Sequence, residues 1–220
     1  MLKVINYTAG ILGANNYLLF DDVSRECALV DCSDVVSIED IFNQNLSDYE
    51  LSAPLKLKYI LLTHGHFDHV GGCYDMKIKY PEVKILAHKR DFELIKALKM
   101  QTMFFGCPSV KNFQVDEYFD SEIEITLGDN KISVIETPGH TLGSVSYLAQ
   151  DMLFTGDTLF YEEIGRCDLP HSDFKQIRTS IVDKLFKLNP KIKVFAGHGM
   201  PSDIAHEVKY NHYFGEFAQF

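Results

Sequence analysis

Four times along this chain, an apolar run ends in a short loop that carries a potential metal ligand. The runs and their following residues are "YILLT" before His64, "ISVIETPG" before His140, "MLFTG" before Asp157 and "VFAG" before His198. Short apolar runs bounded by glycine and polar residues are typical of buried strands. Because loops that leave strand ends gather along one edge of an α/β fold, we expect these four distant segments to converge.

The first junction, "THGHFDH", places four potential ligands between residues 64 and 69. His64 and His66 flank a glycine, so a loop can turn both imidazoles toward one point. Asp68 and His69 are adjacent and leave the backbone in different directions, so this pair can serve a second point. Burying four such side chains without partners would be costly. The sequence therefore predicts metal binding.

Asp157 is the carboxylate among the distant junction residues, and its two oxygens can bridge two cations. The predicted ligand sets that share this bridge are His64, His66 and His140 for one ion, and Asp68, His69 and His198 for the other. Nitrogen and oxygen ligands without thiolate suit zinc, iron or manganese. We predict two divalent metal ions per chain, with zinc the leading candidate.

The remaining pattern predicts an α/β fold in which strands and helices follow one another in each half. We expect a hairpin over residues 15–22 and 26–31, later strands at 58–63, 83–87, 123–127, 131–137, 144–149, 151–155 and 192–196, and helices at 33–48, 69–80, 90–100 and 173–188. Consecutive strands with flanking helices favour an αββα sandwich of two mixed β-sheets. No linker-like segment interrupts the chain, so residues 1–220 are interpreted as a single domain.

Residues 100–118 fit neither a helical nor a strand period, and such a segment is often functional. Met103, Phe104 and Phe105 within it are expected either to form an apolar wall of a pocket or to pack on the core.

Composition excludes several classes of function. A formal net charge of −10 disfavours nucleic acid as a partner, since such binding depends on basic residues. No apolar stretch approaches the roughly 18 residues of a membrane span, and the N-terminus does not resemble a signal peptide. We therefore expect a cytoplasmic protein that is not bound to membranes. The five cysteines form no CxxC pair and are expected to be reduced thiols.

The chain resembles the metallo-β-lactamase superfamily in four motifs: "THGHFDH" at 63–69, "TPGHTLGS" at 137–144, "FTGDTLF" at 154–160 and "AGHG" at 196–199. The resemblance implies the αββα fold and a two-metal site at the positions already singled out. Asp157 stands where many true lactamases carry a cysteine, which argues against antibiotic hydrolysis. His66 stands where the flavodiiron branch has an acidic residue, which argues against oxygen reduction.

Within the superfamily, the chain resembles the small, single-domain glyoxalase II group. "IGRCDLPHSD" at 164–173 is similar to that group's GRTDLP or GRTDFP segment, with Cys167 in place of threonine. Arg166 aligns with a basic residue that contacts the glutathione part of the substrate, whereas Asp168 and Met200 replace the accompanying tyrosines. Full-length members add a C-terminal helical domain, which we do not expect here because the sequence ends soon after His198.

The resemblance implies hydrolysis of S-lactoylglutathione or a related acyl-thiol by a metal-bridging hydroxide, with Asp68 orienting the hydroxide and taking its proton. Persulfide dioxygenases resemble the same group, and they would use one iron bound at His64, His140 and Asp157. A non-catalytic metal-binding module is a third interpretation. The other histidines lie outside the ligand pattern and are expected in surface or packing roles: His88, His171, His206 and His212.

Overall fold

The computed structural model describes residues 1–35 and 55–218, and within these residues the strands form two six-stranded sheets. The first sheet contains β1 (Leu2–Ala9), β2 (Ala14–Asp21), β3 (Glu26–Val30), β4 (Lys56–Leu61), β5 (Lys84–His88) and β6 (Glu117–Phe119), in that order. The second contains β7 (Glu124–Leu127), β8 (Asn130–Glu136), β9 (Val145–Ala149), β10 (Met152–Gly156), β11 (Lys193–Ala196) and β12 (Ser202–Asp203), again side by side in chain order.

Both sheets are mixed, as the sequence predicts. β1, β2 and β3 pair antiparallel, whereas β3 to β6 pair parallel. In the second sheet β7 to β10 are antiparallel, β11 lies parallel to β10, and β12 is antiparallel to β11. β4 in the first sheet and β11 in the second each lie parallel to a neighbouring strand, and each ends at a loop that carries predicted ligands.

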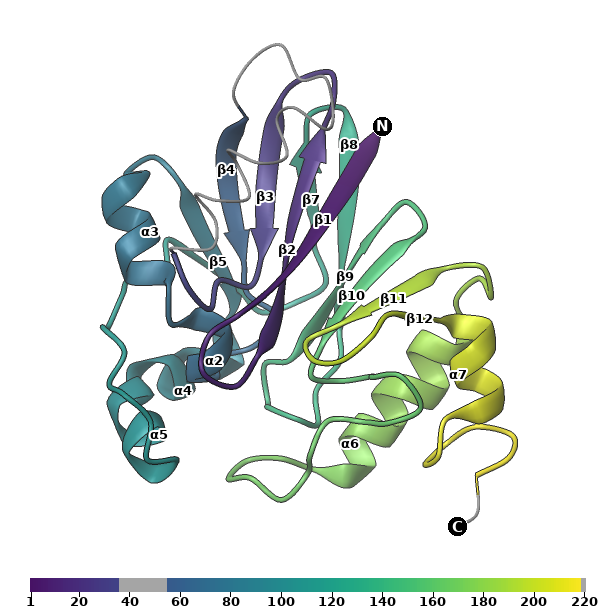
Figure 1. Cartoon of the computed structure of the whole chain (residues 1–220). Helices are drawn as coiled ribbons and strands as arrows, with labels where there is room; N and C mark the ends of the chain where they lie inside the picture. The colour runs from purple at the N-terminus through teal and green to yellow at the C-terminus, as the bar shows by residue number, and fades with distance from the viewer. Residues whose placement is uncertain (36–54, 219–220) are drawn as a thin grey trace.

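Helices cover the outer face of each sheet (Figure 1). The helices on the first sheet are α2 (Phe67–Val70), α3 (Cys73–Lys79), α4 (Phe92–Lys96) and α5 (Leu98–Phe104), and those on the second are α6 (Phe174–Thr179) and α7 (Ile204–Tyr210). One apolar cluster lies between the sheets, and one lies under each helical layer. This is the predicted αββα sandwich.

β2 shows how the layers are built from the sequence. Because successive side chains of a strand point to opposite faces, Tyr17 and Leu19 pack between the sheets while Leu18 and Phe20 pack under the helices. Both faces of this strand are covered, so the whole strand is buried.

The helices predicted at 69–80 and 173–188 are interrupted. The first is split between α2 and α3 at Gly71 and Gly72, where a Cβ on Gly72 would lie 2.9 Å from the Cys32 sulfur. The second begins at α6, capped by the Asp173 carboxylate, and continues as a π-helical turn at Ser180–Lys184 and a 3-10 turn at Leu185–Lys187.

Several elements differ from the sequence prediction or lie outside it. The helix expected at 90–100 is divided into a 3-10 turn at Lys89–Asp91, α4 and the start of α5, with Ala97 between the two helices. The segment at 100–118 is partly regular, since α5 extends to Phe104 and β6 begins at Glu117. β1, β12 and α7 were not predicted from the sequence pattern. The helix expected at 33–48 falls largely in residues 36–54, outside the described part of the chain. Among the helices described, none is long and apolar enough to cross a membrane.

Candidate metal centre

The predicted ligands meet where the strand ends of the two sheets face each other. The loop after β4 carries His64 and His66, α2 carries Asp68 and His69, and the loops after β8, β10 and β11 carry the ligands from the second sheet: His140, Asp157 and His198. All seven side chains belong to one cluster.

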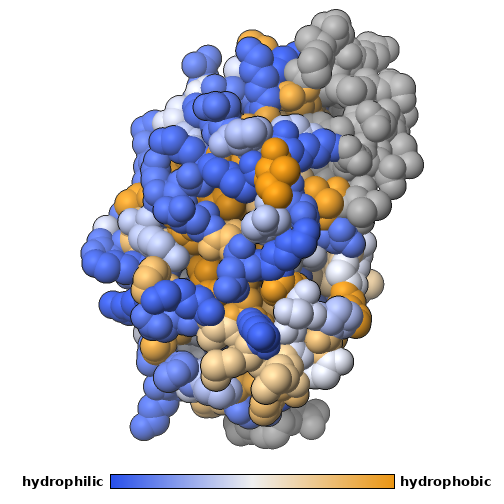
Figure 2. Space-filling view, turned by 90° about the vertical axis from the view of Figure 1, so that its left-hand side faces the viewer, coloured by the Kyte–Doolittle hydropathy of each residue, from blue (hydrophilic) through white to orange (hydrophobic). Residues whose placement is uncertain are grey.

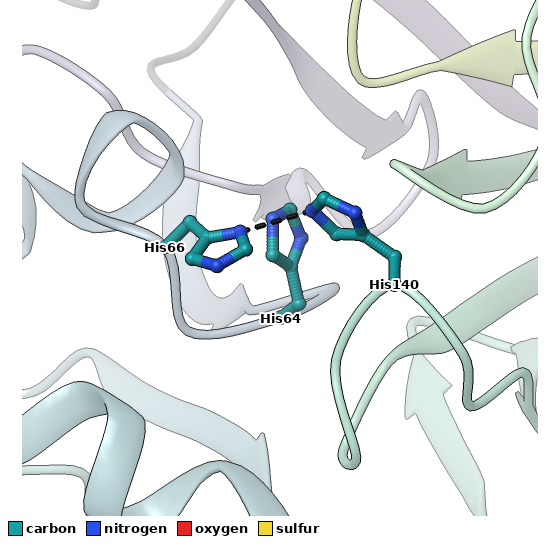
Figure 3. A group of neighbouring side chains, drawn as sticks. All are labelled: His64, His66 and His140. Carbon is teal, nitrogen blue, oxygen red and sulfur yellow. Dashed lines mark hydrogen bonds between the residues drawn. The ribbon is translucent and has the colours of Figure 1, made fainter. Parts of the chain in front are cut away.

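His64, His66 and His140 form the first group. One ring nitrogen of each lies within 4.8 Å of the others, and the three rings face a common point (Figure 3). Nδ1 of His66 and Nε2 of His140 are 2.9 Å apart. Nε2 of His64 is buried and makes no hydrogen bond in the structure. A buried nitrogen without a partner is unfavourable unless a cation or other ligand uses its lone pair.

Asp68, His69 and His198 form the second group, again with one ligand atom each within 4.8 Å of the others. Oδ2 of Asp68 lies 3.4 Å from Nε2 of His198 and 3.6 Å from Nε2 of His69. The two imidazole nitrogens are 3.3 Å apart. Two nitrogens and one carboxylate oxygen are a donor set that suits a divalent cation such as zinc.

Asp157 lies between the two groups. Its Oδ1 is 3.3 Å from Nε2 of His69, and its Oδ2 is 3.6 Å from Nε2 of His140 and 3.7 Å from Nε2 of His198. Oδ1 is buried without a hydrogen bond. The carboxylate thus faces both groups, which is the placement that a bridging ligand requires.

Two glycines allow this close approach. A Cβ on Gly197 would collide with Oδ1 of Asp157, and one on Gly156 would collide with the Thr63 hydroxyl. Gly156 also has a φ of +50°, a conformation that favours glycine. The glycines of "FTGD" and "AGHG" therefore place backbone where any larger residue would displace Thr63 or Asp157.

Asp31 orients two of the histidines and was missed from the sequence. Its buried carboxylate accepts hydrogen bonds from the backbone N–H and hydroxyl of Thr63 and from Nδ1 of His69, all at 2.8 Å. Since the Thr63 hydroxyl donates to Asp31, Nδ1 of His64 must donate to the Thr63 oxygen, 3.0 Å away. Both histidines therefore direct Nε2 into the cluster. Although burial would lower it, Asp157 and Asp31 hold the pKa of His69 well above its usual value, so a cation that binds its Nε2 displaces a proton. Asp31 follows the apolar run "ECALV", so it has the same strand-end signal as the ligands.

His140 is oriented by the backbone. Its Nδ1 donates to the carbonyl oxygen of Arg166 at 3.0 Å, so Nε2 is unprotonated and its lone pair is directed into the cluster, toward Nδ1 of His66. The Arg166 guanidinium itself is exposed and binds Asp168 through two hydrogen bonds of 2.7 and 2.8 Å. Contact between Arg166 and a substrate stays a prediction.

Asp91 is a second buried carboxylate that the sequence reasoning missed. It accepts hydrogen bonds from the Gly65 N–H at 2.8 Å, the Thr141 hydroxyl at 2.8 Å and the Gly143 N–H at 2.7 Å. Asp91 thus ties the loop of His64 and His66 to the loop of His140. "KRD" after an apolar run resembles any strand end, so the sequence carries no specific signal for this role.

The protonation states of His64, His66 and Asp157 favour cation binding at neutral pH. Burial, together with neighbouring histidines, lowers the pKa of His64 well below its usual value and that of His66 to about 3, so both rings are neutral. Burial alone would raise the pKa of Asp157, but the facing His69 and the other histidines hold it well below its usual value. Neutral imidazoles and ionised carboxylates are the forms that bind metals.

The remaining histidines have other partners. His88 is buried and its Nε2 lies 2.9 Å from Glu136, and His206 stacks on Tyr161. His171 lines a pocket beside the cluster. All five cysteines are free thiols, as expected.

Comparison with known proteins places the chain in a family. Residues 9–198 match the family model described as the metallo-beta-lactamase superfamily. Hydroxyacylglutathione hydrolase GloC of Haemophilus influenzae is 37% identical over 160 residues, which cover 71% of this chain and 76% of that protein. The probable metallo-hydrolase YqgX of Bacillus subtilis is 28% identical and covers 95% of this chain and 96% of its own length.

Solved structures agree with these relatives. The BLEG-1 B3 metallo-beta-lactamase superposes with a TM-score of 0.83 at 29% identity, covering 100% of both chains. TTHA1623 in a di-iron-bound form superposes with a TM-score of 0.80 at 27% identity, covering 96% of this chain and 100% of that one. From the matched family model, the fold and these relatives, we conclude that the chain belongs to the metallo-beta-lactamase superfamily.

Proposed function

We propose that this chain is a dinuclear metal-dependent hydrolase of small thioesters, acting on S-lactoylglutathione or a related acyl-thiol. The observation that carries the proposal is the arrangement of two three-residue ligand groups on either side of Asp157. The 37% identity to a hydroxyacylglutathione hydrolase supports thioesters as the substrate class.

The buried, unpartnered atoms of the cluster fit a pair of divalent cations. Nε2 of His64 and Oδ1 of Asp157 are both directed into it without hydrogen bonds. When bound, two such cations lower the pKa of a water toward about 7 and polarise the carbonyl of the substrate.

Asp68 is the residue that we propose to orient the attacking water and to accept its proton. Burial would raise the pKa of Asp68, but its hydrogen bond with His198 holds the pKa below the usual value, so the group is a carboxylate at neutral pH. A thiol has a pKa of about 8.5, so a thiolate leaves without a dedicated proton donor.

An iron-dependent persulfide dioxygenase is the alternative, and it would need only His64, His140 and Asp157. The second group of ligands has no task in that reaction. β-Lactam hydrolysis is a further activity to test, because the similar structure BLEG-1 is described as a B3 metallo-beta-lactamase.

The test combines metal analysis with a substrate panel. Metals in the purified protein are quantified, and the protein is assayed with S-lactoylglutathione, other acyl-thiols, a β-lactam, and glutathione persulfide with oxygen uptake. We expect two metals per chain and thioester hydrolysis. Two bound metals without hydrolysis of any thioester would refute the proposal, and oxygen uptake with one iron would favour the alternative.

The assay has a matched pair of variants. Asp157→Asn removes the shared ligand, whereas Asp120→Asn alters a carboxylate that is 71% exposed and lies outside the metal cluster. Activity that belongs to the metal centre is lost in the first variant and retained in the second.

A further inference from the structure

A pocket of about 480 Å³ opens directly beside the metal cluster, and His66 forms part of its wall. One side of the pocket is formed by α4 and α5, and the other by the loops at 141–142 and 169–171. The volume is within the usual range for small-molecule sites. Because His66 belongs to both, a substrate whose reacting carbonyl lies at the cluster can extend into the pocket.

The pocket wall is mainly apolar. The residues that give it this character include Leu94, Met100, Phe104, Phe105, Leu142 and Leu169. Met100 is 70% exposed, Phe104 76% and Leu142 39%. Figure 2 faces the side on which α3, α4 and α5 lie, and hydrophobic residues gather at its lower end, where α5 lies in Figure 1. Single exposed apolar side chains are common on protein surfaces, whereas a contiguous exposed apolar patch marks a binding surface.

The polar side chains inside the pocket offer little to a charged ligand. The amide of Gln101 accepts from the Phe67 N–H and donates to the Gly65 and Leu94 carbonyls. Asp91 is occupied by its three donors between the ligand loops. Burying a carboxylate or ammonium group against the apolar part of this wall, away from the rim, would leave the charge without a partner, which is unfavourable.

The rim carries opposite charges that offset each other. Arg90 and Glu93 line the pocket, both are exposed, and neither side chain has an ion pair within the part of the chain that is described. Arg90 and Glu93 therefore contribute no net charge that would select an anionic peptide. The pocket volume is enough for about sixteen non-hydrogen atoms, taking about 30 Å³ for each as in liquid water.

We infer that this pocket binds an apolar group of the thioester, so that the preferred substrates carry a hydrocarbon or aromatic group that fits within its capacity of about sixteen non-hydrogen atoms. The inference rests on the proposed thioesterase function and narrows its substrate class. The apolar group belongs either to the acyl part or to the thiol part, since both adjoin the reacting carbonyl.

Two series of substrates for the metal-loaded enzyme distinguish these sources. One series lengthens the acyl chain from acetyl to octanoyl on N-acetylcysteamine, and the other lengthens the thiol of acetyl thioesters from ethanethiol to hexanethiol. We expect kcat/KM to rise about fourfold per added methylene in one series until the pocket is full. A flat dependence in both series, with hydrolysis present, overturns the inference while leaving the proposed function intact.

Binding is measured separately from catalysis. Calorimetric titration with non-hydrolysable thioethers, S-ethyl and S-octyl N-acetylcysteamine, reports the affinity of the pocket even if no thioester is hydrolysed. The S-octyl compound is expected to bind at least tenfold more tightly than the S-ethyl compound, with a negative heat-capacity change. Equal affinities of the two compounds would refute apolar recognition.

α5 provides a matched pair of variants. Phe104→Gln alters the pocket wall, whereas Met103→Gln alters the neighbouring residue, which is 77% exposed but does not line the pocket. Both positions are exposed, so neither change removes a buried contact. We expect Phe104→Gln to reduce the ratio of octanoyl to acetyl kcat/KM, or of octyl to ethyl affinity, about tenfold. The Met103→Gln ratio stays at the wild-type value, and equal ratios in the two variants would contradict the inference.

Discussion

Replacing Asp31 by asparagine tests whether Asp31 fixes the tautomer of the histidines in this cluster. In the wild type, Oδ1 accepts from the Thr63 N–H and Oδ2 accepts from the Thr63 hydroxyl and from Nδ1 of His69. Asparagine has nearly the same shape but only one acceptor oxygen, so its N–H₂ group must face one of these donors. If it faces His69, the ring must carry its proton on Nε2, and the lone pair directed into the cluster is lost.

The expected loss follows from the hydrogen bonds involved. Leaving a buried donor without its acceptor costs about 1 to 3 kcal/mol. At about 1.4 kcal/mol per factor of ten, this corresponds to roughly 5- to 150-fold weaker binding. Removing partners that orient metal-bound histidines typically costs 10- to 100-fold in affinity or activity. We therefore expect Asp31→Asn to weaken zinc binding at the Asp68, His69 and His198 group by about 10- to 100-fold.

Competition titration of zinc against a chromogenic chelator measures both binding steps in one experiment. Asp21→Asn is the matched control, because Asp21 is also buried, accepts a 2.9 Å hydrogen bond from the Ser24 N–H, and is not part of the metal cluster. Asp21→Asn should lower the unfolding midpoint without changing zinc affinity. If folded Asp31→Asn binds two zinc ions as tightly as the wild type, the tautomer argument is wrong.

Four other predictions concern the same centre. Asp157→Asn should reduce the metal content below one ion per chain by mass spectrometry, and full occupancy would exclude a bridging role. Gly197→Ala should destabilise the protein by about 1 to 3 kcal/mol in urea unfolding, because the new Cβ would collide with the Asp157 carboxylate; a neutral effect would contradict the steric argument. Thr63→Val removes the hydroxyl between Asp31 and His64, so we expect weaker zinc binding at the His64 group with less effect on the other ion. Burial and the nearby His140 lower the pKa of His66 from 6.5 to about 3, so the unfolded chain binds more protons between these values; metal-free protein should lose stability as the pH falls from 6.5 toward 3, and His66→Gln should make this slope shallower.

The convergence of the predicted ligands could be foreseen because the loop or helix that carries each of them follows an apolar strand, and parallel strands bring their carboxyl ends to one edge. Most strands of the two mixed sheets were predictable for the same reason, because a short apolar run marks a buried strand in the local sequence. β6 and β12 were missed because three and two residues are too few to show a period of two. β1 was missed because its partly exposed pattern, with Asn6 and Thr8 among apolar residues, is that of an edge strand.

The orienting carboxylates were harder to predict than the ligands. Asp31 and Asp91 act on residues 32 and 50 positions away, and nothing in the local sequence links either carboxylate to its partners. A strand-end aspartate is compatible with a cap, a surface charge or a ligand. Only the fold decides among these roles, because it determines which donors are buried against the carboxylate.

Hydrogen bonds from α5 connect the wall of the apolar pocket to the metal cluster. Gln101, on the helix that forms the pocket wall, holds both the Gly65 carbonyl and the Phe67 N–H, which flank His66 on the two sides. Any shift of α5 that accommodates a larger apolar group must therefore move these hydrogen bonds, and with them the His66 ring. An apolar group that fits without such a shift leaves His66 in place. Once the pocket is full, a longer group requires the shift, so chain length should then act on kcat as well as on KM. If the proposed pocket selects the substrate, Gln101, in the segment whose sequence fitted no regular period, couples that selection to the position of His66.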